Sequence, residues 1–326
     1  MAAVLLLAAV LISLAVTLLV RFYARHHLLD IPNHRSSHQL PTPRGGGLGI
    51  VVAFYAVLLF LFFTGRIESP WFYALLASLL VAGIGFWDDH QSLAARWRLL
   101  VHLGAAMLAV FFLGGQLTTQ FSGLMTLLLS VFFLVWSLNL FNFMDGIDGI
   151  ASSEAVFVSV VLGGLMWFIN SDLALVALVL AASSMGFLIL NWPTAKIFMG
   201  DIGSGFLGFV IALLILIYSQ VSTVFLPIGL IVFSVFIVDA TMTLITRFLR
   251  GEKWYQAHCS HAYQHAARQY GHLKVLLMVW VINLFWLLPI AIWIFLNPGY
   301  GLVGSLIAYL PLIFLAHHFK AGRDWR

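Results

Sequence analysis

The amino-acid sequence predicts an all-α polytopic integral membrane protein with about eleven transmembrane helices. Three observations lead to this fold class: 62% of the 326 residues are hydrophobic, only 9% are charged, and long apolar runs recur along the whole chain. So small a charged fraction excludes an ordinary water-soluble fold. Because no connection between the apolar runs is long enough for a soluble module, we expect one integral membrane domain over residues 1–326.

Glycine, proline and charged residues divide the chain into the expected spans, each of which needs about 20 apolar residues to cross the hydrocarbon core. The first run has no basic region before it and no clear cleavage site after it, so we interpret it as a retained span. The last run is short and contains Pro311. The expected spans are approximately 2–20, 48–63, 70–87, 99–116, 122–141, 150–169, 173–190, 202–219, 224–246, 273–296 and 302–317.

The basic residues predict how the spans are oriented. If the first helix ends in the cytoplasm, fifteen of the 16 Lys and Arg residues fall in cytoplasmic loops or in the C-terminal tail, and only Arg66 falls outside. This asymmetry predicts an external N-terminus and a cytoplasmic C-terminus. The basic residues form no continuous stripe, so we expect a lipid bilayer and not a nucleic acid as the partner. The single cysteine, Cys259, excludes an intramolecular disulfide.

The same topology places five aspartates from three distant parts of the chain at the cytoplasmic face. Any one of them could simply cap a helix or face the lipid headgroups. Together they indicate a functional site, because carboxylates near a membrane are costly unless they face a polar cavity, a metal or a cationic partner. Oxygen ligands without a neighbouring Cys favour Mg²⁺, or Mn²⁺, over zinc. The five residues are Asp88, Asp89, Asp145, Asp148 and Asp201.

Two glycine-rich loops offer groups that a phosphate could use. "PTPRGGG" (41–47) supplies Arg44 and a run of backbone amides, and "MGDIGSG" (199–205) places Ser204 at the start of a span whose N-terminal dipole favours an anion. Glycine runs beside membrane helices also serve close packing, and that alternative stays open. A hard cation beside such loops indicates phosphoryl-transfer chemistry.

Several other polar residues have two readings. His258, His261 and His265 are spaced by three and four, which is compatible with a zinc site, but their basic surroundings favour contact with an anion. Asp239 and Glu154 lie inside expected spans, where each could face a substrate cavity or bond to a neighbouring helix.

The motifs "GIGFWDD" (83–89), "NLFNFMDGIDGIA" (139–151) and "NWPTAKIFMGDIGSGFLG" (191–208), with "DIPNHRSSHQLPTPRGGG" (30–47) and the loop around His261, resemble the polyprenyl-phosphate N-acetylhexosamine-1-phosphate transferases. The resemblance is closest to the bacterial branch that starts O-antigen and related glycans; phospho-MurNAc-pentapeptide transferase is more distant. It implies that undecaprenyl phosphate attacks the β-phosphorus of a UDP-N-acetyl sugar with Mg²⁺, giving undecaprenyl-diphospho-sugar and UMP. It also implies the bacterial inner membrane, with an active site on the cytoplasmic side, and is compatible with a homodimer.

The resemblance assigns roles by motif position. Asp201 is implied as the direct metal ligand, with Asp89 beside it, and Asp88 or Asp89 as a general base or nucleophile at the lipid phosphate. We favour direct attack over a covalent aspartyl intermediate, because a phosphomonoester is largely dianionic at pH 7. The candidate catalytic residues are Asp88, Asp89, Asp145, Asp148 and His261. With the loops included, the candidate substrate-binding residues are Arg44, Arg98, Asn142, Asn191, Lys196 and Ser204.

One stretch departs from the family pattern. Relatives commonly carry a His-x-His-His cluster, whereas this chain reads "SHAYQHA", so that only His261 matches and Tyr263 and Gln264 stand in the later places.

Two other classes of membrane protein compete with this reading. A secondary transporter predicts charges near the midplane and inverted repeats. A CDP-alcohol phosphatidyltransferase also uses an Asp-rich metal site, but its aspartates lie within about two helices, while these are spread over distant segments. The sequence does not reveal which N-acetyl sugar is used.

Overall fold

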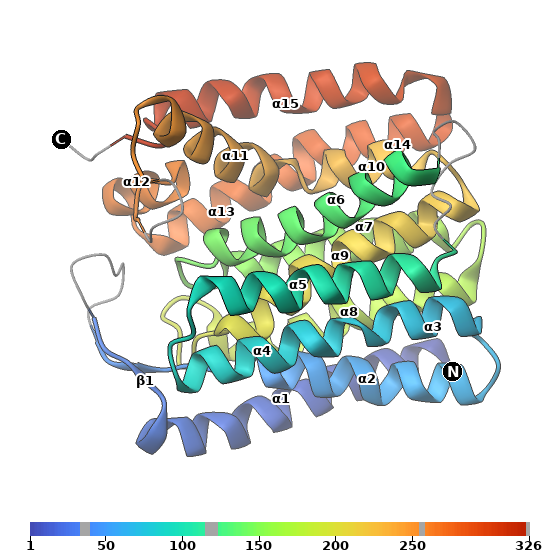
Figure 1. Cartoon of the computed structure of the whole chain (residues 1–326), viewed down its shortest axis with the longest axis horizontal. Helices are drawn as coiled ribbons and strands as arrows, with labels where there is room; N and C mark the ends of the chain where they lie inside the picture. Colours follow the sequence, from blue (N-terminus) through green and yellow to red (C-terminus); the bar gives the residue numbers. More distant parts are fainter. Residues whose placement is uncertain (33–39, 115–122, 254–257, 324–326) are drawn as a thin grey trace.

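The computed structural model describes residues 1–32, 40–114, 123–253 and 258–323, which form a bundle of helices with one short pair of strands (Figure 1). The all-helical prediction is confirmed for this part of the chain. The α-helices are α1 Ala2–His27, α2 Gly47–Phe63, α3 Ser69–Leu76, α4 Ser78–His90, α5 Ala95–Phe112, α6 Gly123–Met144, α7 Ile150–Met166, α8 Ser171–Asn191, α9 Asp201–Val221, α10 Phe225–Val232, α11 Ser234–Leu249, α12 Ala262–Tyr270, α13 His272–Ile282, α14 Leu288–Leu296 and α15 Gly301–His318. A π-helical segment, η1 Asn283–Leu287, joins α13 to α14, and a 3-10 turn, η2 Pro298–Tyr300, precedes α15.

Within the described residues each of the eleven expected runs falls mainly on helix, but the helices differ in length, and residues 115–116 and 122 of two runs lie outside the described part. Among the described residues, eight helices are long and apolar enough to cross a membrane, or nine if α10 and α11, which meet at a bend of 68°, form one broken span. The apolar helices α2 and α7 have 17 residues each. At 1.5 Å per residue they reach about 26 Å, against a hydrocarbon core of about 30 Å. The count of eleven crossings therefore stays a prediction.

The core of the bundle lies around α9. Every residue from Ile202 to Ser219 is buried, and α9 packs against α2, α4, α6, α7 and α10. A helix that is apolar on all sides has to be surrounded by other helices. By contrast, α1 packs only one side against α2 and α8 and exposes Leu7, Leu11 and Phe22 on the other. The central position of α9 brings its N-terminus within reach of several neighbouring helix ends.

A short hairpin lies at one end of this bundle. β1 (Leu29–Asp30) pairs antiparallel with β2 (Thr42–Pro43). Figure 1 shows the hairpin and α12 at the end opposite the N-terminus. The sequence analysis did not predict these strands, which have two residues each, too few for a pattern of alternation. The hairpin closes the connection between α1 and α2 and brings Asp30 and Arg44 to the same end as the predicted site.

The opposite end of the bundle carries the one basic residue that the sequence analysis put outside. Arg66 Nη1 lies 2.6 Å from Asp172 Oδ1, so the α2–α3 loop is paired with the start of α8. The alternation of the helices thus separates these two residues from the predicted site, as the expected topology requires.

Candidate active site

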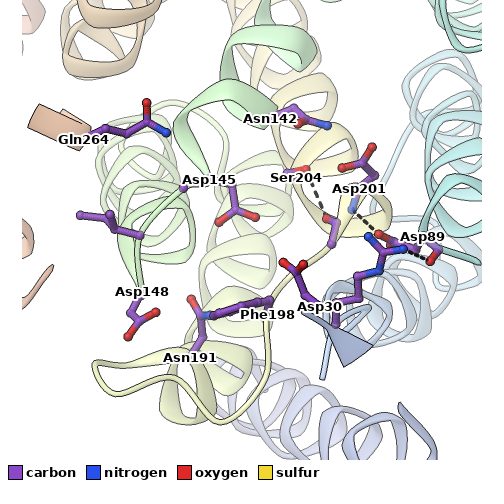
Figure 2. Close-up of a pocket in the computed structure, with 14 residues that line it drawn as sticks. Asp30, Asp89, Asn142, Asp145, Asp148, Asn191, Phe198, Asp201, Ser204 and Gln264 are labelled. Carbon is purple, nitrogen blue, oxygen red and sulfur yellow. Dashed lines mark hydrogen bonds between the residues drawn. The ribbon is translucent and has the colours of Figure 1, made fainter. Parts of the chain in front are cut away.

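A polar cavity of about 240 Å³ opens at the hairpin end of the bundle. Figure 2 shows carboxylate, amide and aromatic side chains around it, from β1, the last turns of α4, α6 and α8, the α6–α7 and α8–α9 loops, and the first turns of α9 and α12. These segments are far apart in sequence, and several of them meet here because α4, α6 and α7 pack around α9.

Asp89 closes the N-terminus of α9. α4 ends at His90, so Asp89 lies in its last turn, only 3% exposed. Its Oδ1 accepts a hydrogen bond from the backbone N–H of Asp201 at 3.0 Å, and its Oδ2 accepts one from that of Ile202 at 3.2 Å. Gly200 makes this approach possible, because its φ is +77° and any Cβ would collide with the Asp89 carboxylate. A charge-assisted cap of this kind satisfies first-turn N–H groups that would otherwise be left without partners.

The neighbouring carboxylate, Asp88, faces a cation instead. Arg98 Nη1 lies 2.7 Å from Asp88 Oδ2 and 3.1 Å from Asp201 Oδ2, so one guanidinium joins α4, α5 and α9. Asp88 Oδ1 also accepts from the backbone N–H of Leu93 at 2.6 Å, which holds the turn between α4 and α5. A second guanidinium, that of Arg44, donates to the backbone carbonyl of Asp89. The two arginines offset part of the negative charge gathered here.

Asn191 ties the α6–α7 loop to the α8–α9 loop. Its Oδ1 accepts from the backbone N–H of Gly149 at 3.0 Å and from Ser152 Oγ at 3.1 Å, and its Nδ2 donates to the carbonyl of Ile197 at 3.0 Å. Asp148 adds to the same junction, since its Oδ2 accepts from the backbone N–H of Ala195 at 3.1 Å. These bonds fix the side chain of Asp148 and the backbone that follows it.

Asp145 is where the negative charge of the site is least compensated. Desolvation, followed by the charges of Asp201, Asp89 and Asp148, raises the pKa of its carboxyl to about 7. A carboxyl with so high a pKa has neighbours that disfavour its ionised form. The cavity thus favours a bound cation.

α12 lies on the other side of the α6–α7 loop and contributes Gln264 to the cavity. His261, just before α12, is 2% exposed, and its Nδ1 lies 3.3 Å from Asp239 Oδ1. Its ring also stacks on that of His258, with centroids 5.0 Å apart. Among the described residues no three His, Cys, Asp or Glu side chains are gathered closely enough to hold a metal ion, so the histidine spacing does not form a zinc site there.

Comparison of the sequence with known proteins shows the family to which the chain belongs. Residues 71–219 match the model of glycosyl transferase family 4. The chain is 32% identical over 274 residues to a probable undecaprenyl-phosphate N-acetylglucosaminyl 1-phosphate transferase of Bacillus subtilis, covering 78% of this chain and 74% of the relative. The chain belongs to glycosyl transferase family 4. This confirms the family resemblance drawn from the motifs.

Two further relatives show how wide the similarity is. A decaprenyl-phosphate N-acetylglucosaminephosphotransferase of Mycobacterium tuberculosis (strain ATCC 25618 / H37Rv) is 34% identical over 206 residues, which cover 56% of this chain and 51% of that protein. A phospho-N-acetylmuramoyl-pentapeptide-transferase of Streptococcus pneumoniae (strain CGSP14) is 28% identical over 233 residues, covering 66% of this chain and 69% of that protein. The aspartate motifs of α4 and of the α6–α7 loop lie within the segment that matches the family model.

The structure brings most of the predicted site residues of this family member to one cavity. Eight of the predicted residues lie on the cavity wall, although two of these, Asp89 and Asn191, use their polar atoms for bonds within the protein. The anion site predicted at the start of α9 is filled by the Asp89 carboxylate, and Ser204 Oγ donates to the carbonyl of Gly200. The predicted residues on the wall are Arg44, Asp89, Asn142, Asp145, Asp148, Asn191, Asp201 and Ser204.

Four predicted residues do not line the cavity. Asp88 and Arg98 pair with each other beside Asp201. Lys196 is exposed on the α8–α9 loop. His261 is held by Asp239, and Gln264 lines the cavity from the same segment. The contact between His261 and the phosphates therefore rests on the family resemblance alone.

Six residues on the cavity wall were not among the predicted site residues, and three of these have polar or aromatic side chains. Asp30 lies on β1, in a loop that was quoted for its arginine and glycines. Phe198 lines the cavity from the α8–α9 loop, but one more phenylalanine among 28 gives no signal in this composition. Gln264 was noted as a departure from the histidine cluster, and that departure was the signal which could have marked it.

The cavity offers the kind of donor atom that a hard divalent cation prefers, although no three His, Cys, Asp or Glu side chains among the described residues are close enough together to hold one. Asp145, Asp201 and Asn142 offer carboxylate and amide oxygens, which Mg²⁺ prefers. Asp89 is a weaker candidate as a direct ligand, because both of its oxygens already accept backbone hydrogen bonds. Asp239 and Glu154 lie outside this set: Asp239 caps α12, and Glu154 Oε2 accepts from Asn283 Nδ2 at 2.8 Å. Glu154 thus contacts a neighbouring helix, whereas Asp239 both bonds to the start of α12 and lines a second, largely apolar cavity of about 680 Å³.

Proposed function

We propose that this chain transfers an N-acetylhexosamine 1-phosphate, with N-acetylglucosamine as the first candidate, from its UDP-sugar to undecaprenyl phosphate, releasing UMP. The relatives from Bacillus subtilis and Mycobacterium tuberculosis support the donor and the lipid acceptor, since their names specify N-acetylglucosamine and a polyprenyl phosphate. The observation that carries the proposal is the meeting of Asp89, Asp145 and Asp201, from three distant segments, at one cavity with Arg44.

The charges of the cavity suit a reaction between two phosphate-bearing substrates. Phosphoryl transfer needs little covalent help from the protein and depends on positioning and charge neutralisation. Mg²⁺, when bound, would neutralise charge on the transferred phosphoryl group. Asp201 and Asp145 would hold the cation, and Asn142 would orient the nucleotide side. The lipid phosphate, already largely dianionic at pH 7, attacks directly, and the Asp88–Arg98 pair lies where the acceptor would approach Asp201.

Phe198 gives the cavity a place for the nucleobase. Its ring is on the cavity wall, and two backbone bonds hold the segment, from Phe198 N to the carbonyl of Pro43 and from Gly46 N to the carbonyl of Phe198, at 2.8 and 2.9 Å. A ring on such a fixed backbone can stack on a base, and stacking of this kind contributes about 1–3 kcal/mol per base.

The proposal extends to the orientation and the cellular role. The asymmetry of the basic residues supports a cytoplasmic active site in the bacterial inner membrane, with the N-terminus outside. The product, a lipid-linked diphospho-sugar, is a form on which further sugars can be added at the membrane. The reaction would thus initiate O-antigen or a related cell-envelope polysaccharide.

The experiment is an assay of UMP release in membranes that contain the full chain, undecaprenyl phosphate and a panel of UDP-N-acetyl sugars, with and without Mg²⁺. We expect Mg²⁺-dependent release with UDP-N-acetylglucosamine. Asp201→Asn should reduce turnover at least about 100-fold, because it removes a charge from the metal site. The matched control is Asp172→Asn, which changes a carboxylate at the opposite end of the bundle and should keep normal turnover. If no sugar gives metal-dependent UMP, the proposed transferase activity is wrong.

A further inference from the structure

The α11–α12 segment contains a buried carboxylate that the proposed reaction does not use. Asp239 lies in α11 and is 7% exposed; it does not line the polar cavity, but it lies on the wall of a second, largely apolar cavity of about 680 Å³ between α11, α12, α13 and α15. Its Oδ1 accepts from the backbone N–H of Ala262 at 3.0 Å and from Thr243 Oγ1 at 3.2 Å, and lies 3.3 Å from His261 Nδ1. Its Oδ2 accepts from the backbone N–H of Tyr263 at 2.8 Å. Both oxygens of this carboxylate therefore bond to groups at the start of α12.

These bonds determine where α12 begins. The helix spans nine residues, Ala262–Tyr270, and its first N–H groups have no partners inside the helix. Asp239, from a neighbouring helix, takes two of them, and Gln264 Oε1 takes the N–H of His261 at 3.2 Å. A negative charge at this position also interacts favourably with the helix dipole. Loss of the Asp239 charge should therefore loosen the first turn of α12.

That first turn lies directly on the α6–α7 loop. Tyr263 Oη donates to the carbonyl of Phe143 at 2.9 Å, two residues before Asp145. Gly146, the residue after Asp145, lies against the same turn of α12. A Cβ at this position would collide with Tyr263 Oη and come within 3.1 Å of Gln264 Nε2. The contact thus reaches the backbone on both sides of Asp145.

We propose that Asp239 is a positioning residue for the transfer reaction: it fixes the start of α12, through which Tyr263 holds the Asp145 loop and Gln264 stays at the cavity wall. The inference rests on the proposed function for its effect on turnover, but not for its effect on the loop. Asp239 touches neither substrate in this scheme. It acts through Tyr263 on the position of Asp145, which the proposed reaction needs at the metal site.

The test compares Asp239→Asn, Tyr263→Phe and the double variant in the full chain. Tyr263→Phe removes only the hydroxyl that bonds to Phe143, so it should leave the fold intact and lower kcat about tenfold, with little change in KM for the UDP-sugar. Asp239→Asn should lower kcat at least as much. If both act along one path, the double variant should be no slower than Asp239→Asn alone, since coupled residues give non-additive effects. Multiplying losses would show that the two residues act independently, and would overturn the proposal.

The matched control is Tyr218→Phe. Tyr218 Oη donates to the carbonyl of Leu173 at 2.9 Å, a bond of the same type and length at the opposite end of α9, so its loss should leave kcat unchanged. The second readout is amide hydrogen exchange of the segment 143–149, which should be faster in Asp239→Asn and Tyr263→Phe but not in the control. Unchanged exchange in both variants would refute the positioning role. Exchange that changes while even the unmodified chain releases no UMP would instead refute the proposed function.

Discussion

Removing the side chain of Asn191 should affect both the stability of the fold and the rate of the reaction. Asn191→Ala would remove three hydrogen bonds at a site that is 3% exposed. Ser152 Oγ can still donate to the carbonyl of Gly149 at 3.3 Å, so two groups, Gly149 N–H and Ile197 C=O, lose their side-chain partner. A buried polar group left without a partner costs about 1–3 kcal/mol. We therefore expect a loss of about 3 kcal/mol in the free energy of unfolding, or roughly 4 °C in Tm for a chain of this length.

The same change should slow turnover more than it weakens substrate binding. Asn191 holds the backbone next to Asp148 against the α8–α9 loop, so its loss lets the Asp145–Asp148 loop shift relative to α9. Displacement of a catalytic group by about 1 Å can cost about 100-fold in rate, and we expect a fall in kcat of this order.

Thermal unfolding of the purified chain and initial rates of UMP release measure the two effects. The matched control is Asn139→Ala, since within the described residues Asn139 Nδ2 donates to the carbonyl of Val135 in its own helix, at 2.7 Å. That variant should stay within about 0.5 kcal/mol of the starting chain. If Asn191→Ala unfolds at the same temperature as Asn139→Ala and keeps its kcat, the junction between the two loops is not what holds the site together.

Two further outcomes are expected at the cavity. Because the pKa of Asp145 is raised to about 7 in the fold, the folded state binds its proton more tightly than the unfolded chain does, so this group's contribution to stability is present at low pH and is lost as pH rises from about 4 through 7. Without divalent cations, the free energy of unfolding should therefore fall between pH 5 and 8, by at most about 1.4 kcal/mol per pH unit from this group. Mg²⁺ should restore the lost stability more at pH 8 than at pH 5. If Asp145→Asn leaves the slope of stability against pH unchanged, another group causes the effect. Phe198→Leu should raise KM for the UDP-sugar about 5- to 100-fold with little effect on kcat, as expected for lost base stacking, and an unchanged KM and unchanged inhibition by UMP would remove Phe198 from the nucleotide site.

The meeting of the aspartates was predictable because it follows from topology. Once the apolar runs are taken as alternating spans, the end of α4, the α6–α7 loop and the start of α9 have to lie at one face, whichever helices are neighbours. The structure adds that α4 packs on α9 closely enough for Gly85 to touch the backbone of Asp201, since a Cβ there would come within 2.5 Å of its carbonyl oxygen. Such a contact needs the packed bundle and cannot be derived from the spacing of residues.

Other parts of the site carried no readable signal. Phe198 is chemically ordinary in this composition, and only its place on a backbone that bonds to the β2 strand makes it a cavity residue. Asp239 had two readings, because an intramembrane carboxylate looks the same in sequence whether it faces a substrate or caps a helix, and a bond to a neighbouring helix was preferred. The structure shows the cap through its bonds to Ala262 and Tyr263, and it also places Asp239 on the wall of a second, largely apolar cavity.

Asp88 and Asp89 show why adjacent residues of one motif have to be assigned separate roles. Successive side chains on an α-helix point about 100° apart, so only one of the two can face the start of α9. Asp89 does so and takes its first N–H groups, while Asp88 turns to Arg98. The cap depends on the packing of α4 against α9, and the same packing places Asp201 beside Arg98 and at the cavity. One of the two motif carboxylates therefore builds the site, and the other is left close to Asp201, where the acceptor phosphate is proposed to react.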